Sequence, residues 1–225
     1  MTEPASQPGA DYFANHARAR QFPWTLYHQP LERDLARFLG QVAGEHPRGE
    51  VLIVGCGLLH ELDAAPDGLT FHVADIDERA VAAVLARRDP RITGGTVVAP
   101  ERPIDQDLAH DLGADRRFAA IYAKEVVEHV HAWPSWLAGL RRALVPGGRL
   151  WLSTPNYGEP WLAALEATVL EVIARRSGFS RRDIHPTRFS RRSLARGLAA
   201  AAFEAVEVTV TPTRLALTAW AKAPR

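Results

Sequence analysis

Two glycines and an aspartate are the first residues whose types and spacing indicate chemistry. Residues 51–54 are apolar and lead directly into Gly55, Cys56 and Gly57, and Asp75 follows eighteen residues after Gly57, at the end of a second apolar stretch. Glycines allow a sharp turn close to a ligand, and an acid at this spacing in a βαβ unit can accept hydrogen bonds from ribose hydroxyls. We therefore expect an adenosine-containing ligand. The alternative for Asp75 is a solvated loop acid.

A second group of motifs lies between residues 118 and 156. A strand candidate at 118–123 is followed by Lys124-Glu125-Val126-Val127-Glu128-His129-Val130, then by Pro146-Gly147-Gly148, and then by Ser153-Thr154-Pro155-Asn156. Proline followed by two glycines suits a tight turn between a helix and a strand. The patterns E-V-x-E-H-V, L-x-P-G-G and S-T-x-N closely resemble those of the ubiquinone-biosynthesis O-methyltransferases and related small-molecule enzymes. These are class I S-adenosylmethionine (SAM) methyltransferases.

This resemblance implies SAM as the cofactor and the turn at residues 55–57 as the first motif of the class. It also implies an acid before strand 118–123 that meets the adenine amino group, for which we choose Asp107 over Asp105, with Leu108 as an apolar wall. Glu125 would line the methionyl end. The cofactor-binding residues expected are Gly55, Cys56, Gly57, Asp75, Ile76, Asp107, Leu108, Lys124 and Glu125.

A histidine is expected to assist the reaction. The sulfonium of SAM becomes neutral as the methyl group leaves, so the protein mainly aligns nucleophile, methyl and sulfur. If the acceptor is a hydroxyl, a base that titrates near pH 7 helps, and histidine is tuned to that range. His129 is the first candidate and His185 the second; the alternative for His129 is a backbone-bonded histidine at a helix start. Tyr12, Asn156 and Tyr157 are expected to contact the substrate.

The resemblance also raises the question of a metal site, because related O-methyltransferases sometimes use a divalent metal. Glu128, His129 and His131 lie close together in the sequence, but their spacing is not diagnostic of zinc or magnesium. Cysteine ligands are absent from the group. We therefore expect no tightly bound metal.

The elements that position these residues predict an α/β fold. We expect a doubly wound, seven-stranded, mostly parallel sheet of the Rossmann-like methyltransferase type, with an antiparallel last strand and a helical cap. Apolar periodicity and turn residues predict strands at 51–54, 71–75, 96–99, 118–123 and 150–153, a hairpin of 205–210 with 215–220, and helices at 31–42, 58–65, 78–88, 135–144 and 190–202. The short helix 58–65 would direct its amides at the methionyl carboxylate.

We expect one domain over residues 1–225, with two segments outside its core. Residues 1–47 form an N-terminal helical or lid segment, whose crowded aromatic side chains either cover the cofactor or pack on the core. Residues 156–192 form a cap insertion. Its apolar stretch 160–175 is a packed cap helix, a substrate wall, a dimer face or a membrane-touching face, and the arginine-rich stretch 175–196 is a solvated basic face or a contact for an anionic substrate or lipid.

Composition limits the function classes. A net charge of +1 gives no general attraction to nucleic acid, and base-stacking aromatics are not interleaved with the arginines. One cysteine excludes an internal disulfide framework, and no signal peptide or membrane-spanning run is evident. We expect a cytoplasmic enzyme that acts on a small-molecule or lipid-like substrate, without stable membrane insertion. A homodimer is one option for its assembly.

Two alternatives to methyl transfer stay open, and residues of the glycine turn bear on both. Leu59 stands where the family usually has a third glycine, and Ile53 stands where it often has an acid. These two residues motivate a non-catalytic binding or regulatory module that retains the fold. A nicotinamide-dependent oxidoreductase is disfavoured, because His60 replaces the third glycine of the dinucleotide pattern G-x-G-x-x-G and because such an enzyme has no need of the turn Pro146-Gly147-Gly148.

Overall fold

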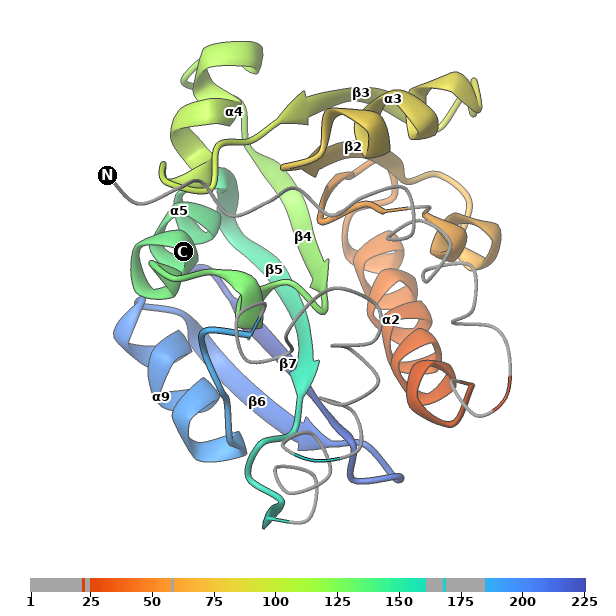
Figure 1. Ribbon diagram of the computed structural model, residues 1–225. Coiled ribbons are helices and arrows are strands. Elements are labelled where there is room, and N and C mark those ends of the chain that lie inside the picture. Colours follow the sequence, from red (N-terminus) through yellow and green to blue (C-terminus); the bar gives the residue numbers. More distant parts are fainter. Residues whose placement is uncertain (1–21, 23–24, 58, 161–167, 169–184) are drawn as a thin grey trace.

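One seven-stranded sheet organises the structure (Figure 1). The computed structural model describes residues 22, 25–57, 59–160, 168 and 185–225. The strands are β1 Glu50–Val54, β2 Thr70–Asp75, β3 Ile92–Val97, β4 Phe118–Lys124, β5 Leu144–Pro155, β6 Glu204–Val210 and β7 Ala216–Lys222. Their spatial order is β3-β2-β1-β4-β5-β7-β6, and β7 runs antiparallel to both of its neighbours. This confirms the predicted fold class.

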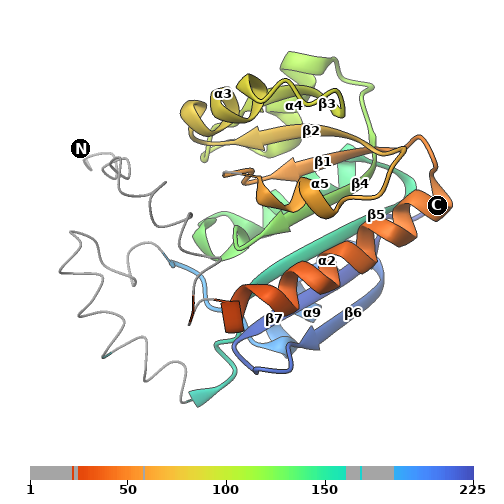
Figure 2. The ribbon, with the colours of Figure 1, turned by 90° about the vertical axis from the view of Figure 1, so that its right-hand side faces the viewer.

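Helices cover both faces of the sheet. They are α2 Thr25–Glu45, α3 Glu78–Ala86, α4 Ile104–Leu112, α5 Trp133–Ala143 and α9 Arg191–Ala200, with 3-10 turns η2 His60–Ala64 and η3 Val127–His129. Alternate residues of β1 enter different cores: Val51 and Ile53 pack with α2 and α3, whereas Leu52 and Val54 pack with α4, α5 and α9. Figure 2 shows α2 and α9 on opposite sides of the sheet.

The predicted amphipathic helix is confirmed, and it is longer than predicted. Its apolar face is buried against the sheet through Leu31, Leu35, Phe38, Leu39 and Val42. The helix begins at Thr25 and contains Pro30, whereas the sequence suggested a start after this proline. Tyr27, on the turn before Pro30, packs against the same core, so tertiary contacts support the additional turn.

The hairpin and three further helices match their predictions within one or two residues at most ends. Asp77 caps α3 by accepting a hydrogen bond from the Arg79 backbone N–H at 2.9 Å, and Ser190 caps α9 by accepting one from Ser193 at 3.2 Å. Strand β6 pairs antiparallel with β7, as the alternation of residues 205–220 indicated.

Strand β3 was predicted wrongly. It spans Ile92–Val97 rather than 96–99, and it contains Gly94 and Gly95, which are poor strand formers and hid its first half. Gly95 allows α3 to approach, since a Cβ here would lie 2.5 Å from Cγ1 of Val81. Val98 and Ala99 lie beyond the strand.

Two turns also differ from expectation. The segment Pro146-Gly147-Gly148 is an irregularity within the long strand β5, where the register with β4 shifts, and not a turn before a separate strand. Gly147, with φ +74°, supplies the left-handed residue that this irregularity needs. The predicted helix 58–65 is the five-residue 3-10 turn η2, because Pro66 and Gly68 follow too soon for an α-helix. The α-helix whose amides were expected to face the methionyl carboxylate is therefore not formed.

Several predictions lie outside the described residues. Among them are Tyr12, most of the aromatic segment before α2, and nearly all of the apolar stretch 160–175. The arginine-rich stretch is described only from residue 185 onward. The lid and the cap insertion therefore stay predictions.

Candidate functional site

The site lies where the strand order reverses, at the carboxyl ends of β1 and β4. From these two neighbouring strands the chain proceeds to β2 on one side and to β5 on the other, which is where ligands bind in open α/β sheets. Gly55 follows β1 with φ +72°, and a Cβ here would lie 2.4 Å from Cγ2 of Val126. The glycine turn and the segment after β4 are therefore in close contact.

Asp75 is tied to the glycine turn. Its carboxylate accepts hydrogen bonds from the backbone N–H groups of Gly57 at 3.2 Å and Asp77 at 3.0 Å. The Cys56 thiol lies against it, and burial together with the negative charge of Asp75 raises the thiol pKa. Asp75 is thus fixed by its neighbours and half-buried. Beside it the apolar side chain of Ile76 is 65% exposed.

The two aspartates considered for adenine face different neighbours. Asp107 is buried near the start of α4, where its carboxylate accepts a hydrogen bond from the Ala99 backbone N–H at 2.8 Å and pairs with Arg102 at 2.7 Å. It therefore faces the loop that follows β3. Leu108 is buried in the core.

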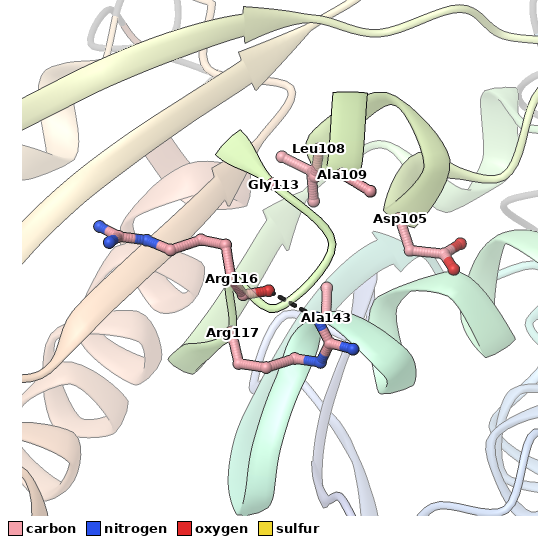
Figure 3. A pocket seen from close by; sticks show the side chains of 7 residues that line it. All are labelled: Asp105, Leu108, Ala109, Gly113, Arg116, Arg117 and Ala143. Carbon is pink, nitrogen blue, oxygen red and sulfur yellow. Dashed lines mark hydrogen bonds between the residues drawn. The ribbon is translucent and has the colours of Figure 1, made fainter. Parts of the chain in front are cut away.

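Asp105 faces α5 instead, where Arg142 donates two hydrogen bonds to its carboxylate at 2.6 and 2.9 Å. It lines a shallow hollow beside α4 with residues that precede β4 (Figure 3). In this hollow the Arg117 guanidinium donates to the carbonyl of Arg116. Asp105 is thus held away from the loop after β3.

Lys124 and Glu125 end β4 and are held by separate contacts. The Lys124 ammonium pairs with Glu61 of η2 at 2.5 Å and with Glu32 of α2 at 3.6 Å. The Glu125 carboxylate accepts hydrogen bonds from the hydroxyls of Tyr27 and Ser153, the latter at 2.8 Å. With φ +57°, Glu125 occupies the left-handed region, a strain found most often at functional sites.

Tyr27 is a residue of this site that the sequence did not single out. Burial and the charges of Glu125 and Glu128 raise its pKa well above the ordinary value, so its hydroxyl keeps its proton and donates a hydrogen bond to the Glu125 carboxylate. The sequence showed Tyr27 as one of several aromatic residues before the first strand. Its position was hidden because the helix was predicted to begin only after Pro30.

The two candidate histidines meet beyond the end of β4. His129 and His185 have ring centroids 4.8 Å apart, and Nε2 of His129 lies 3.9 Å from Oε1 of Glu128. The Tyr157 hydroxyl and Nδ1 of His185 share a hydrogen bond of 2.6 Å. His129, Tyr157 and His185, which the sequence analysis singled out separately as catalytic or substrate-binding candidates, therefore lie in one cluster.

Backbone contacts hold this cluster together. The Thr187 N–H donates to the Glu128 carbonyl at 3.2 Å, and the Tyr157 N–H donates to the Phe189 carbonyl at 2.9 Å. Asn156, also expected at the substrate, is buried, and its amide donates to the Arg214 carbonyl at 3.1 Å. In the structure Asn156 thus supports the loop that presents Tyr157.

Comparison with known proteins agrees with this geometry. The family model described as a methyltransferase domain matches residues 9–208. The Burkholderia thailandensis 1,6-didemethyltoxoflavin-N1-methyltransferase, with bound 1,6-didemethyltoxoflavin and S-adenosylhomocysteine, is 18% identical with a TM-score of 0.61, over 100% of this chain and 94% of its own. No curated protein sequence matches the chain.

Two further solved structures share the fold. The methyltransferase in complex with the Haloferax volcanii Trm112 activator is 16% identical with a TM-score of 0.66, over 98% of this chain and 100% of its own. The N-methyltransferase NodS of Bradyrhizobium japonicum, in complex with S-adenosyl-L-homocysteine, is 16% identical with a TM-score of 0.56, over 96% and 98%. Among the described residues, no helix is both long and apolar enough to cross a membrane.

Proposed function

Because the chain belongs to the methyltransferase domain family and is a SAM-dependent enzyme, we propose that it transfers the methyl group to a hydroxyl oxygen of a small-molecule or lipid-like acceptor. The observation that carries this proposal is the cluster of His129, His185 and Tyr157, next to the segment that contacts the glycine turn. We expect the reaction to take place in the cytoplasm, in line with the single cysteine of the chain.

The adenosine end of SAM is assigned to the turn and the strand ends beside it. Gly55, Cys56 and Gly57 let the cofactor approach the backbone, and Asp75 accepts hydrogen bonds from the ribose hydroxyls. Ile76 and Val97 are exposed apolar side chains at the ends of β2 and β3, and they offer a surface for the adenine ring. Asp107 and Leu108 support the loop after β3 that would border the base.

The methionyl end is assigned to the residues that follow β4. Glu125 can accept a hydrogen bond from the methionyl ammonium, and Lys124 can attract the carboxylate. Tyr27 and Ser153 already hold the Glu125 carboxylate in place, so binding requires little further ordering of this group.

The acceptor hydroxyl would meet the transferable methyl group at the histidine cluster. His129 is better placed than His185 to take a proton from the acceptor hydroxyl. Its side chain is 42% exposed, so a substrate that enters from solvent can reach it, whereas His185 is buried. As the oxygen loses its proton it attacks the methyl carbon, the carbon–sulfur bond breaks, and its electron pair neutralises the sulfonium. Positioning supplies most of the rate, with a base adding about 10²- to 10⁴-fold.

Nitrogen is the competing acceptor, because two of the structural neighbours are named as N-methyltransferases. The test is a panel of phenols, catechols, primary alcohols and amines, with S-adenosylhomocysteine formation and product mass as readouts. Methylated hydroxyl products that require His129, lost in His129→Gln and kept in His131→Gln, support the proposal. Turnover of amines alone would overturn the choice of oxygen. Tight SAM binding without turnover of any acceptor would favour the non-catalytic module instead.

A further inference from the structure

The hydroxyl of Tyr122 is a buried donor without an acceptor. Tyr122 lies in β4, and its side chain is 2% exposed. Among the residues that the structure describes, none forms a hydrogen bond with its hydroxyl. A hydroxyl buried in this way costs free energy, because it has given up its hydrogen bonds to water and gained none in return. A partner that the hydroxyl gains in another state of the protein would explain why it is there.

The surroundings of the Tyr122 ring place it next to the cofactor site. The ring packs edge-on against Trp151 of β5, with the centroids 6.5 Å apart. It shares the core under α2 with Cys56 of the glycine turn and with Leu59 and Leu62, which border or belong to η2. Burial raises the pKa of Tyr122 well above its usual value, and the charge of Glu61 raises it further. The hydroxyl therefore keeps its proton and can only act as a neutral donor or acceptor.

Lys124 brings the Glu61 carboxylate to the same face of β4. Side chains two residues apart in a strand point to the same side, so Lys124 lies on the side of Tyr122. The Lys124 ammonium pairs with Glu61 of η2 at 2.5 Å and with Glu32 of α2 at 3.6 Å. The side chains of Lys124 and Glu61 are only 14% and 16% exposed, so water contributes little to either charge. A donor in need of an acceptor thus lies beside a largely buried ion pair.

Binding of the cofactor must disturb this ion pair. The methionyl carboxylate is assigned to Lys124, whose ammonium is already shared by two glutamates. A third carboxylate would gather three negative charges around one positive charge, so the bond from Lys124 to Glu61 has to weaken as the cofactor binds. Glu61 keeps its other contacts, but part of its charge compensation is lost. A half-buried carboxylate in this position is stabilised by any further hydrogen-bond donor.

We propose that Tyr122 is a positioning residue of the cofactor site: when the methionyl carboxylate engages Lys124, the Tyr122 hydroxyl donates a hydrogen bond to Glu61. The inference rests on the proposed function for the assignment of Lys124 to the methionyl end. The exchange gives the buried hydroxyl its acceptor and restores a donor to Glu61, so it favours the bound state. A hydrogen bond to a carboxylate that forms only in this state adds about tenfold or more to the affinity.

The test compares stability and affinity in Tyr122→Phe, which keeps the ring and removes only the hydroxyl. The free protein should unfold at the same or a higher urea concentration than wild type, because the lost group has no partner there. SAM and S-adenosylhomocysteine should bind about tenfold more weakly in calorimetric titrations. The probe 5′-methylthioadenosine keeps the adenosine and the sulfur but has no amino-acid group, so wild type and variant should bind it equally.

The matched control is Thr154→Val, which also removes a buried hydroxyl with little change of shape. The Thr154 hydroxyl in β5 likewise has no hydrogen-bond partner in the described part of the chain. Its side chain points to the face of β5 opposite to that of Trp151, away from the core of Tyr122. Thr154→Val should therefore match Tyr122→Phe in stability and match wild type in affinity for all three ligands. Equal weakening of SAM binding by the two variants overturns the exchange.

A double-mutant cycle with Glu61→Ala tests the proposed acceptor. Without the Glu61 carboxylate the exchange cannot occur, so Tyr122→Phe should have no further effect on the affinity for SAM. The same weakening with and without Glu61 overturns the proposal, as does unchanged SAM affinity in Tyr122→Phe. A lower stability of free Tyr122→Phe overturns it too, because the hydroxyl would then be paired before the cofactor binds.

Lys124→Gln separates this proposal from the assignment on which it rests. If SAM binds Lys124→Gln as tightly as wild type, Lys124 does not hold the methionyl carboxylate, and both the assignment and the exchange fail. If SAM binding is weakened in Lys124→Gln but not in Tyr122→Phe, the assignment stands and only the exchange fails. None of these titrations contains a methyl acceptor, so the choice of a hydroxyl acceptor is decided separately by the acceptor panel.

Discussion

The carboxylate of Asp75 accepts a hydrogen bond from the backbone N–H of Gly57 at 3.2 Å. The acid expected to bind the ribose therefore also holds the glycine turn. Asp75→Asn keeps the shape of the side chain but removes one of its two strong acceptors, so it should weaken SAM binding about tenfold or more, in keeping with the loss of a charge-assisted hydrogen bond. The measurement is a calorimetric titration with SAM and with S-adenosylhomocysteine.

The matched control for Asp75 is Asp77, two residues later. Asp77 caps α3, and asparagine is an equally good capping residue, so Asp77→Asn should leave both stability and SAM affinity within about 0.5 kcal/mol of wild type. NAD should bind neither variant nor wild type. Equal loss of SAM affinity in the two variants would show that Asp75 acts only through the local fold.

Gly55 is predicted to be intolerant of any side chain. In Gly55→Ala the residue must keep φ +72°, and its Cβ would lie 2.4 Å from Cγ2 of Val126. The left-handed backbone costs about 1 kcal/mol and the overlap about 1–3 kcal/mol more. Urea unfolding should therefore show a loss of about 2–4 kcal/mol. In the double variant with Val126→Ala the steric overlap is removed, so the stability lost to the overlap should return while the cost of the left-handed backbone remains. If no stability returns, contact with Val126 is not the cause of the loss.

Most strands of the sheet were predictable because buried strands leave a direct signal in the sequence. Continuous apolar runs such as 51–54 occur where both faces of a strand are covered, and the structure pairs them as expected. Strand β3 was misplaced because two glycines weaken its strand signal, although packing favours them: Gly94 lies against the His72 ring, and Gly95 makes room for Val81 of α3. Packing also decides the conformation of Leu59. Its backbone is in the left-handed region, with φ +47°, which leucine disfavours, but its side chain is buried in the core.

The site was predictable residue by residue but not as an assembly. The motif around His129 and the position of His185 were evident, yet nothing in the sequence indicated that the two rings lie 4.8 Å apart. The two segments that carry these rings are joined by a backbone hydrogen bond from Thr187 to the Glu128 carbonyl, a contact between residues far apart in the sequence. Pairings such as Tyr27 with Glu125 require the relative placement of a helix and a strand, which local periodicity does not contain.

His72 should make the protein sensitive to mild acid. Burial lowers the pKa of its imidazole, whose Nε2 lies 3.0 Å from the Thr96 hydroxyl, and the nearby Arg116 lowers it further, while Glu50 and Asp111 act in the opposite direction. The unfolded chain therefore takes up a proton below about pH 6.5 that the folded chain refuses. This contribution to stability is fully present above that pH, decreases as the pH falls from about 6.5 toward the lowered folded pKa, and is gone below it.

The check for His72 is a comparison of slopes rather than of absolute stability. His72→Gln can still hydrogen-bond but does not titrate, so between pH 6.5 and 5 wild type should lose up to about 2 kcal/mol more than the variant, at no more than about 1.4 kcal/mol per pH unit. Urea unfolding at several pH values measures both. Parallel curves would mean that His72 is protonated in the folded protein as readily as in the unfolded chain.

Asp34 should contribute more to stability than its place on an outer helix suggests. Its Oδ2 accepts hydrogen bonds at 2.9 Å from the indole N–H groups of both Trp151 in β5 and Trp220 in β7, so one carboxylate fastens α2 to two strands. Asp34→Ala leaves these donors without their acceptor, at about 1–3 kcal/mol for a buried group and less for the half-buried Trp220. We expect a loss of about 2–4 kcal/mol in urea unfolding followed by tryptophan fluorescence, with Asp34→Asn intermediate.

The control is the neighbouring Arg37. Arg37→Ala removes only an exposed ion pair with Asp34 and a stacking contact with Trp220, so it should cost at most about 1 kcal/mol. Equal losses in Asp34→Ala and Arg37→Ala would mean that the surface ion pair, and not the two indole bonds, holds α2 against the sheet.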